Sequence, residues 1–257
     1  MIRKNNFFAL TLFFVLPLLV LSSCKDDDDS TPQNDKNDDV FELAIRRVNT
    51  GVSISEFTSA RDTFVAKLMT EEGTSNDREV QPFFNYLGSD LPLDSVYIGL
   101  TQYEDVATYN SLGQSLSSST EAQTFFGTFT PIIFEALQPL DEYKPVDLGT
   151  VAPLGTGQVL EIAVRDLSTY SNFNQADYET ARDAFLTKLS QQNGFVKEIQ
   201  WKSVLNPNIV VGMTVYESQQ AVIAINSDAT FTGSLETQTF IGNYPPSVFG
   251  TINTILK

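Results

Sequence analysis

Residues 41–46 (FELAIR) and 60–68 (ARDTFVAKL) decide the fold, because both segments return later in the same order. They return at residues 160–165 (LEIAVR) and 181–189 (ARDAFLTKL). Further pairs follow along the two copies: Gly73 with Gly194, Ile98–Glu104 with Val211–Glu217, Glu121–Phe125 with Glu236–Phe240, and Pro131 and Phe134 with Pro246 and Phe249. A period of about 120 residues is too long for a solenoid repeat, so the duplicated unit is a whole domain.

The first 23 residues have the order of a secretory signal. Arg3 and Lys4 precede an apolar run over residues 7–21, and small residues lead to Cys24. The run is shorter than the roughly 20 residues that span a bilayer, so we expect a signal peptide over residues 1–23. Cys24 is the only cysteine, and the sequence LSSC that ends on it resembles the lipobox of bacterial lipoproteins. This resemblance implies that Cys24 is the lipid attachment site.

An acidic stretch follows Cys24. Residues 25–30 read KDDDDS, and residues 24–39 contain almost no apolar side chain. Such a segment cannot bury enough surface to offset its ordering entropy, so we expect a flexible tether rather than a calcium site. Lysine and several acids directly after a lipidated cysteine also resemble the surface-export signal of lipoproteins from Bacteroidota. The resemblance implies an outer membrane lipoprotein on the cell surface, with the periplasmic face as the alternative.

Composition limits the function classes. The chain has 32 acidic and 16 basic residues and a net charge of −16, which repels phosphate backbones and excludes nucleic-acid partners. It has no histidine, so it lacks the usual proton shuttle near neutral pH and any triad built on histidine. Without histidine, a second cysteine or a spaced acidic loop, we expect no metal site. We also expect no cofactor.

Each copy reads as strand, helix, strand, strand, helix. The expected strands cover residues 41–47, 80–87 and 96–103 in the first copy and 159–165, 196–204 and 209–216 in the second. A capping box at Ser53 to Glu56 opens the first helix, and Gly73 and Gly194 follow the helix ends. A second helical region is expected over residues 125–137 and 240–256, and a last short strand over residues 143–148.

That element order is typical of a ferredoxin-like α+β unit, in which helices cover one face of an antiparallel sheet. We therefore predict two ferredoxin-like domains, at residues 40–146 and 157–257, joined by a connection near residues 139–157. Each domain alone would expose an apolar sheet face, which two sheets packed face to face would cover. The expected product is a monomer that contains an intrachain pseudo-dimeric α/β barrel.

A helix with the pattern FxxKL, a glycine, two strands and the segment YESQQA at residues 216–221 resemble the antibiotic biosynthesis monooxygenase family of dimeric α/β barrels. The resemblance covers most of both copies and is best over residues 194–221, because the first copy has an insertion around residues 88–94. Family members often carry a histidine after the third strand, and that position falls near Ile225 here. The resemblance therefore implies the fold without the usual haem ligand.

Some members of this family oxidise aromatic compounds with oxygen and no cofactor, and they hold the substrate with tryptophan, asparagine, arginine and tyrosine. The resemblance implies five ligand-binding candidates here: Trp201, Tyr216, Tyr103, Arg182 and Asn206. Each also has a structural alternative. Trp201 suits a core, Asn206 a hairpin turn with Pro207, Tyr216 the end of a strand, and Arg182 a role in orienting the first helix.

Two functions of different class remain open, so the sequence leaves enzyme status undecided. One is a surface-anchored lipoprotein that binds a small hydrophobic ligand or a protein partner without catalysis, and the alternative is a cofactor-free monooxygenase-like enzyme acting on a small aromatic compound. The absence of histidine and of a repeated polar cluster favours binding. A barrel interior with a cavity facing Trp201 would favour the enzyme, and a filled interior would favour the binding protein.

Overall fold

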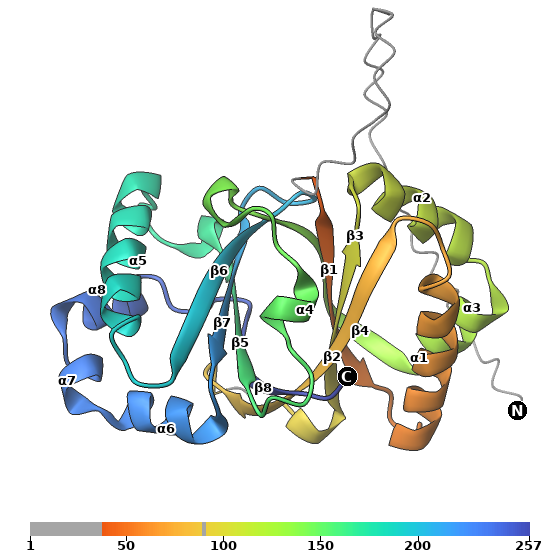
Figure 1. Cartoon of the computed structure of the whole chain (residues 1–257), viewed down its shortest axis with the longest axis horizontal. Coiled ribbons are helices and arrows are strands. Elements are labelled where there is room, and N and C mark those ends of the chain that lie inside the picture. Colours follow the sequence, from red (N-terminus) through yellow and green to blue (C-terminus); the bar gives the residue numbers. More distant parts are fainter. Residues whose placement is uncertain (1–37, 89–90) are drawn as a thin grey trace, which may run out of the picture. The chain divides into compact units, whose positions relative to one another are not determined.

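The structure, a computed structural model, describes residues 38–88 and 91–257. The expected signal peptide, Cys24 and the tether up to residue 37 lie outside the described residues. Within them the chain is an α+β protein with a closed barrel of eight antiparallel strands (Figure 1). None of the helices in this part of the chain has the length and apolar character needed to span a bilayer.

The two sequence copies form two halves of the barrel with the same element order. The first half contains β1 (Val40–Val48), α1 (Ile54–Leu68), β2 (Thr74–Asn85), β3 (Val96–Tyr103), α2 (Val106–Leu116), α3 (Thr120–Phe126) and β4 (Phe129–Pro139). The second half contains β5 (Val159–Asp166), α5 (Gln175–Leu189), β6 (Phe195–Ser203), β7 (Ile209–Tyr216), α6 (Gln219–Ser227), α7 (Ala229–Thr232), α8 (Leu235–Asn243) and β8 (Phe249–Ile255). Figure 1 shows the helices of the two halves on opposite sides of the strands.

The strands follow the order β1-β3-β2-β8-β5-β7-β6-β4 around the barrel. Each half therefore has a four-stranded ferredoxin-like sheet, and the halves join where β2 pairs with β8 and β4 pairs with β6. This confirms the predicted intrachain pseudo-dimeric α/β barrel, and it shows that the two sheets are also joined at their edges. Edge strands carry unpaired backbone groups, and joining the edges satisfies those groups while the closed sheet covers its own apolar face.

The structure corrects the last elements of each copy. The regions expected to be helical, residues 125–137 and 240–256, are short helices followed by strands β4 and β8, which pair with β1 and β5. Their many β-branched and aromatic residues suit a strand. Residues 143–148 form no strand but end a 3-10 turn and enter α4 (Leu148–Val151). The second strand of the first copy, expected at residues 80–87, begins earlier, as β2 (Thr74–Asn85), and the other expected strands agree with the observed ones to within one residue at each end.

Local sequence explains where the first helices begin and end. The Ser53 hydroxyl accepts a hydrogen bond from the backbone N–H of Glu56 at 3.1 Å, as the capping box predicts. After the helices, Gly73 and Gly194 have φ angles of 84° and 90°, a left-handed conformation that glycine adopts without strain. The same turn therefore leads into the second strand of each half.

Apolar side chains fill the barrel interior. The largest cluster of buried side chains includes Leu43 and Ile45 of β1 with Ile162 of β5. Trp201 belongs to it, is 1% exposed, and meets the ring of Phe41 edge-on at a centroid distance of 4.6 Å. A filled interior is the outcome that we expected of a binding protein rather than of an enzyme. Because the interior is filled, a ligand cavity has to lie outside the barrel.

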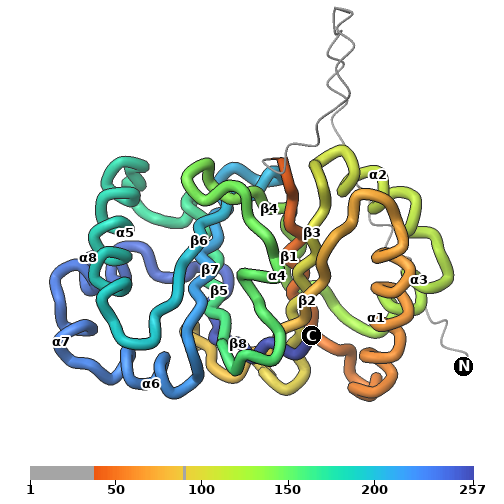
Figure 2. Tube along the Cα trace, in the orientation of Figure 1, coloured from red at the N-terminus to blue at the C-terminus, as the bar shows by residue number. Residues whose placement is uncertain are grey.

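The connection between the halves covers the end of the barrel where β2 and β6 begin. Val146 and Leu148 of this segment are buried in the barrel cluster. The backbone N–H of Leu148 donates to Gln102 of β3 at 3.0 Å, and Arg78 of β2 donates to the carbonyl of Ala152 at 2.9 Å. Figure 2 shows the connection, with α4, running between the strands of the two halves. The connection is thus part of the core.

Candidate functional site

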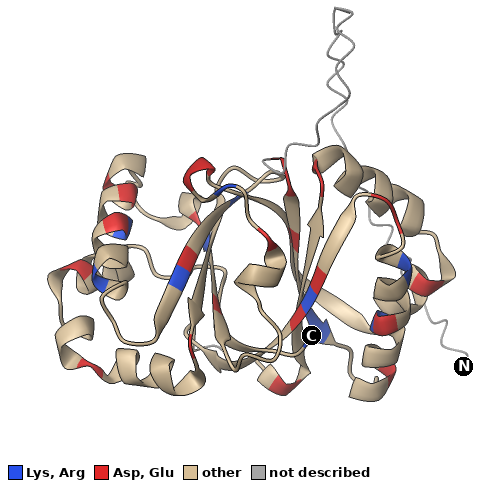
Figure 3. Cartoon of the chain, viewed as in Figure 1, with Lys and Arg blue, Asp and Glu red and all other residues tan. Residues whose placement is uncertain are grey.

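Charged side chains lie between each sheet and its helices, on the outer face of the barrel. Figure 3 shows acidic residues on β2 and β6, which contribute to this layer. In the first half the charged residues of this layer are Glu42 and Arg46 of β1, Arg61 of α1, and Asp77 and Glu79 of β2. The matched strand registers and the sequence repeat place Glu161, Arg165, Arg182, Glu198 and Gln200 at the same positions in the second half. A polar cluster is therefore repeated, which corrects the expectation that none is.

A cavity of about 90 Å³ lies in the first half between the sheet and its helices. Its polar wall comes from the strands and includes Glu42, Arg46, Asp77 and Thr101. The opposite wall comes mainly from the helices and is apolar, with Phe64, Leu68, Leu112, Leu116, Phe125 and Phe126, while Phe134 of β4 and Tyr103 of β3 also contribute. The cavity therefore combines a charged floor with an aromatic and aliphatic roof, as ligand sites for small organic molecules do.

Arg46 is held across the floor of this cavity. Its guanidinium carbon lies 5.1 Å from the ring centroid of Phe125, and Nη2 lies 4.0 Å from Oε2 of Glu79. Gly99 leaves the required space, because a Cβ atom there would overlap Nη2 of Arg46. The Nε donor of Arg46 has no hydrogen-bond partner among the described residues. An unpaired buried donor is costly, so an acceptor on a bound ligand would be favoured here.

The other charged groups of the first half bind one another. Arg61 is buried and its Nη1 lies 3.1 Å from Oε2 of Glu79. Thr101 donates a hydrogen bond to Oδ1 of Asp77 at 3.2 Å. Together with Glu42 and Arg46, this makes three carboxyl groups against two guanidinium groups. Carboxyl groups therefore outnumber guanidinium groups by one, and this excess of negative charge favours protonation of one of the carboxyl groups.

Glu42 has the properties of a general base. Burial raises its pKa to about 7, because loss of solvent disfavours the charged form, while Arg46 acts in the opposite direction and Asp77 adds to the rise. A carboxyl group that titrates near neutral pH can both accept and return a proton under working conditions. Among the charged residues that line the cavity, Glu42 is therefore the best candidate for proton transfer.

Tyr103 lines the same cavity and packs edge-on against Tyr109 at a centroid distance of 5.3 Å. Burial raises the pKa of both phenols above the usual value. Their hydroxyl groups therefore stay protonated at neutral pH, and they can donate hydrogen bonds but not act as bases.

In the second half, the corresponding charged groups have protein partners. The Tyr216 hydroxyl donates to Oε2 of Glu161 at 2.7 Å. Nε of Arg165 donates to the carbonyl of Tyr244 at 2.8 Å, whereas Nε of Arg46 has no such partner among the described residues. Glu161 and Nε of Arg165 are therefore bound within the chain, whereas buried atoms of Arg182, Glu198 and Gln200 have no hydrogen-bond partner among the described residues.

Tyr86 occupies the second half's counterpart of the cavity. This residue directly follows β2, which pairs with β8, and its backbone N–H donates to the carbonyl of Gly250 at 2.9 Å. Glu161 and Asn226 lie within hydrogen-bonding range of its hydroxyl. Its ring packs against the apolar cluster that contains Leu189, Val222, Ile225 and Phe231. A side chain from the first half thus fills the site of the second half.

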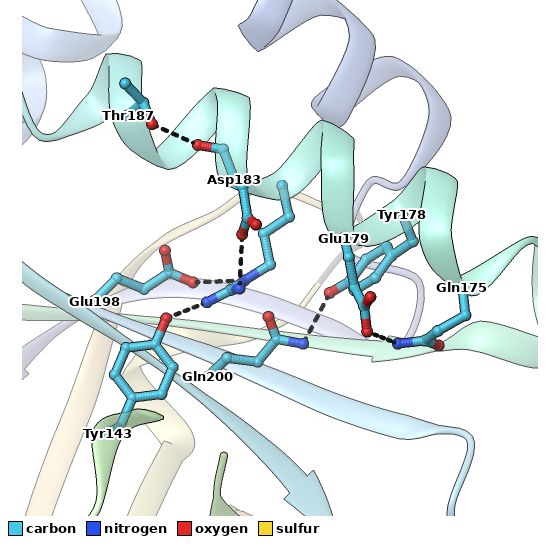
Figure 4. Close-up of polar contacts among 9 residues, drawn as sticks. Tyr143, Gln175, Tyr178, Glu179, Asp183, Thr187, Glu198 and Gln200 are labelled. Atoms are coloured by element: carbon cyan, nitrogen blue, oxygen red, sulfur yellow. Dashed lines mark hydrogen bonds and ion pairs between the residues drawn. The ribbon is translucent and has the colours of Figure 1, made fainter. Parts of the chain in front are cut away.

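Arg182 lies near the connection rather than in an open cavity. Its guanidinium contacts the hydroxyl of Tyr143, and its Nε lies 3.9 Å from Oε1 of Glu198. Burial raises the pKa of Glu198 to about 7, opposed by the nearby arginines. Gln200 donates to the Tyr178 hydroxyl at 3.4 Å. Figure 4 shows Tyr143, Glu198 and Gln200 facing the side chains of α5, so this group fastens the connection to the second half.

The structure separates the five candidates named from the sequence. Trp201 is in the barrel interior, and Asn206 is in the turn after β6, where its side chain accepts from the N–H of Asn208 at 3.0 Å. Tyr216 and Arg182 lie in the second half, bound to Glu161 and near Glu198. Tyr103 is the one candidate that lines the first-half cavity.

The residues that build the cavity floor were not among the sequence candidates. The signal for them was present, because FELAIR and LEIAVR place a glutamate and an arginine on the same face of an otherwise apolar strand in both copies. Buried charges repeated on a strand are unusual and mark a site or an ion-pair network. Tyr86 has no counterpart in the second copy, so the repeat could not reveal it.

Comparison with known proteins identifies the fold. No family model matches the chain, and no curated protein matches it. Solved structures do: an anthrone oxidase-like protein has a TM-score of 0.61 at 13% identity, covering 87% of this chain and 94% of that one. A proposed chlorite dismutase has a TM-score of 0.54 at 7% identity (85% and 95% covered), and a proposed monooxygenase of Fusobacterium nucleatum has 0.51 at 10% identity (85% and 93%).

These likenesses extend over nearly the whole length of each neighbour, so they apply to the complete two-half barrel. At such low identity they establish the fold and nothing finer. The chain has a closed α/β barrel of the kind found in monooxygenase-like proteins.

Proposed function

We propose that the first-half cavity binds a small aromatic compound with an acidic C–H or O–H group and oxidises it with molecular oxygen, without a cofactor. The observation that carries this proposal is Glu42, a buried carboxyl group whose pKa is raised to about 7 in a cavity with an aromatic roof. Arg46, with its unpaired Nε, supplies the positive charge that such a reaction requires. The likeness to an anthrone oxidase-like protein agrees with this chemistry but does not identify the substrate.

The proposed reaction needs no added reductant, because the substrate itself supplies the electrons that reduce oxygen. Glu42 removes a proton from an activated methylene group, and Arg46 stabilises the resulting enolate. The enolate passes one electron to oxygen, and the radical pair combines to form a carbon–oxygen bond. The peroxide takes the proton back from Glu42 and loses water to leave a carbonyl group. One methylene and one oxygen molecule thus become one ketone and one water.

Cavity size restricts the ligand. At about 90 Å³ the cavity is smaller than the roughly 300–1,000 Å³ of pockets that enclose drug-sized ligands. Phe126 and Phe134, which line it, are 41% and 38% exposed and lie at its rim. We infer that a substrate places one ring edge over Glu42 and displaces these two rings outward.

Oxygen uptake tests the proposal, with anthrone as the probe substrate and the full chain as the enzyme. The Glu42→Gln variant should lose about 10²- to 10⁴-fold in rate, the usual contribution of a general base. Glu161→Gln changes the matching carboxyl group of the second half and should leave the rate unchanged. Equal losses in both variants, or no oxygen uptake by the wild type, would contradict the oxygenase.

A binding protein is the second candidate, favoured by the filled barrel interior and the small cavity. In this case the first-half cavity holds an aromatic ligand without converting it. Calorimetry would then show saturable binding of anthrone that Glu42→Gln alters, with no oxygen consumed. The two measurements on the same variants separate a binding protein from an oxygenase.

For location we propose an outer membrane lipoprotein, anchored through Cys24 and displayed on the cell surface by residues 25–29. The supporting observation is the sequence order of signal, LSSC and acidic stretch. Cys24→Ala should release the protein from membranes, and a labelled fatty acid should mark the wild type but not the variant. Replacing Asp26 to Asp29 with alanine should keep the label and abolish protease access on whole cells.

We also propose that the chain is a monomer, because both sheet edges of each half are already paired within it. Sedimentation of the full chain tests this, and a stable dimer would contradict it.

A further inference from the structure

Two aromatic side chains of the first half, Phe83 and Tyr86, pack against the apolar cluster of the second half, whereas the described residues that line the first-half cavity all belong to the first half. Strand β2 has 12 residues and β6 has 9. The extra length lets β2 pair with β8 as far as Asn85↔Thr251 and delivers Tyr86 beside Gly250. By contrast, β6 ends at Ser203, where it pairs with Leu137 of β4, and turns back into β7.

Tyr86 sits where an external ligand of the first half would sit. Glu42 pairs with Thr101 and Glu161 pairs with Thr214, so the two carboxyl groups hold the same strand position. On the helix above, Asn226 of α6 holds the position of Gly113 of α2, which lines the first-half cavity. The Tyr86 hydroxyl bridges Glu161 and Asn226. It therefore spans the second-half equivalent of the space that is open in the first half.

The contacts of Tyr86 are those of a recognised phenol rather than of a side chain that merely fills space. Its hydroxyl lies within hydrogen-bonding range of Asn226 and of Glu161, a buried carboxyl group to which Tyr216 also donates at 2.7 Å. Its ring faces apolar side chains from α5, α6 and α7. A site that hydrogen-bonds a hydroxyl group discriminates strongly against an analogue without it.

We propose that the second half contains a binding site for para-substituted phenols that Tyr86 occupies from within the chain. Removal of the Tyr86 side chain frees this site for a phenol from solution. The site is independent of the oxygenase proposed for the first half, because it uses Glu161 and Asn226 and not Glu42. Each chain accordingly has one site open to external ligands and one that it fills itself.

The test is calorimetric titration of the full-length Tyr86→Ala variant with p-cresol, the free equivalent of the tyrosine side chain. The variant should bind one more p-cresol per chain than the wild type, and at least about tenfold more tightly than toluene, which has the same shape without the hydroxyl. Tyr86→Phe is the matched control, because it keeps the ring in place and should gain no p-cresol site. Combining Tyr86→Ala with Glu42→Gln should leave the extra site intact.

An extra site that takes toluene as tightly as p-cresol would overturn the proposal, since it would be a simple apolar cavity. No extra site would overturn it as well. If Tyr86→Ala does not fold alone, millimolar p-cresol should restore its native circular dichroism by mass action, and toluene should not. Failure of that rescue would equally contradict the site, whereas absence of oxygen uptake by the wild type would bear on the first half alone.

Discussion

The two halves of this barrel come from one duplicated unit, yet one has a cavity where the other has a tyrosine. Around Glu42 the chain leaves space and an arginine donor without a partner among the described residues. Around Glu161 it supplies Tyr86, Tyr216 and Asn226. The difference teaches that the same buried carboxyl group can serve chemistry or packing, depending on what the rest of the chain places above it.

The largest difference between the halves should appear in stability. Tyr86→Ala removes a ring from a packed site and leaves Glu161 short of a donor, so it should lower the free energy of unfolding by about 3–5 kcal/mol. Phe134→Ala removes a ring at the rim of the first-half cavity that is 38% exposed, and it should cost less than about 1 kcal/mol. Urea unfolding of both variants measures this, and similar losses would show that the two sites are equally filled.

The carboxyl groups themselves should differ in pH dependence. Burial raises the folded-state pKa of Glu42 from 4.5 to about 7, so the folded state holds its proton where the unfolded state has lost it. This group therefore costs stability as pH rises from 4.5 to 7, up to about 3 kcal/mol above pH 7. Glu42→Gln should remove that cost and gain stability at pH 8 relative to pH 4.5.

Glu161→Gln is the comparison for that experiment. Burial raises the pKa of Glu161 too, but the hydroxyls of Tyr216 and Tyr86 donate to its carboxylate and favour the charged form. Its gain at pH 8 should therefore be smaller. Urea midpoints at the two pH values decide the point, and a larger gain for Glu161→Gln would reverse the roles assigned to the two carboxyl groups.

The sequence predicts an element well where neighbouring residues in the chain decide its structure. It predicts poorly where contacts between distant residues decide it. The strands at residues 96–103 and 209–216 could be placed to the residue, because continuous apolar runs are buried on both faces. Residues 129–139 were misjudged, since the segment IIFEAL suits a helix as well as a strand and only pairing with β1 decides. Tyr86 was not foreseeable, because its partners Glu161 and Asn226 are distant in sequence and nothing in the second copy repeats it.

The paired glycines offer a third, smaller contrast. A Cβ atom at Gly99 would overlap the guanidinium of Arg46, whereas at Gly212 it would lie 3.2 Å from the end of the Glu198 side chain. Gly99→Ala should therefore displace Arg46 and cost about 1–3 kcal/mol, and Gly212→Ala should cost less. Thermal unfolding compares them. If Gly212→Ala is the more damaging change, the first-half floor is looser than its geometry indicates.

The smallest effect should come from filling the first-half cavity. Gly113 lies within α2 and lines the cavity, and a Cβ atom there meets nothing within 4 Å. Gly113→Ala should add about 0.5–1 kcal/mol of stability through helix propensity. Gly113→Leu should keep the fold and weaken p-cresol binding to the first half. Gly242→Ala, in α8 and equally unobstructed, is the control and should leave ligand binding unchanged; a loss there would mean that the probe binds elsewhere.

The unequal lengths of β2 and β6 have a consequence for symmetry. In a dimer of identical chains, an extension that enters the neighbour's site does so in both directions, so it closes both sites or neither. A single chain carrying both copies is free of that restriction, since each copy can change alone. The longer β2 is such a change in one copy alone. It places Tyr86 in the site of the second half and leaves the first-half cavity open, an asymmetry that two identical subunits cannot adopt.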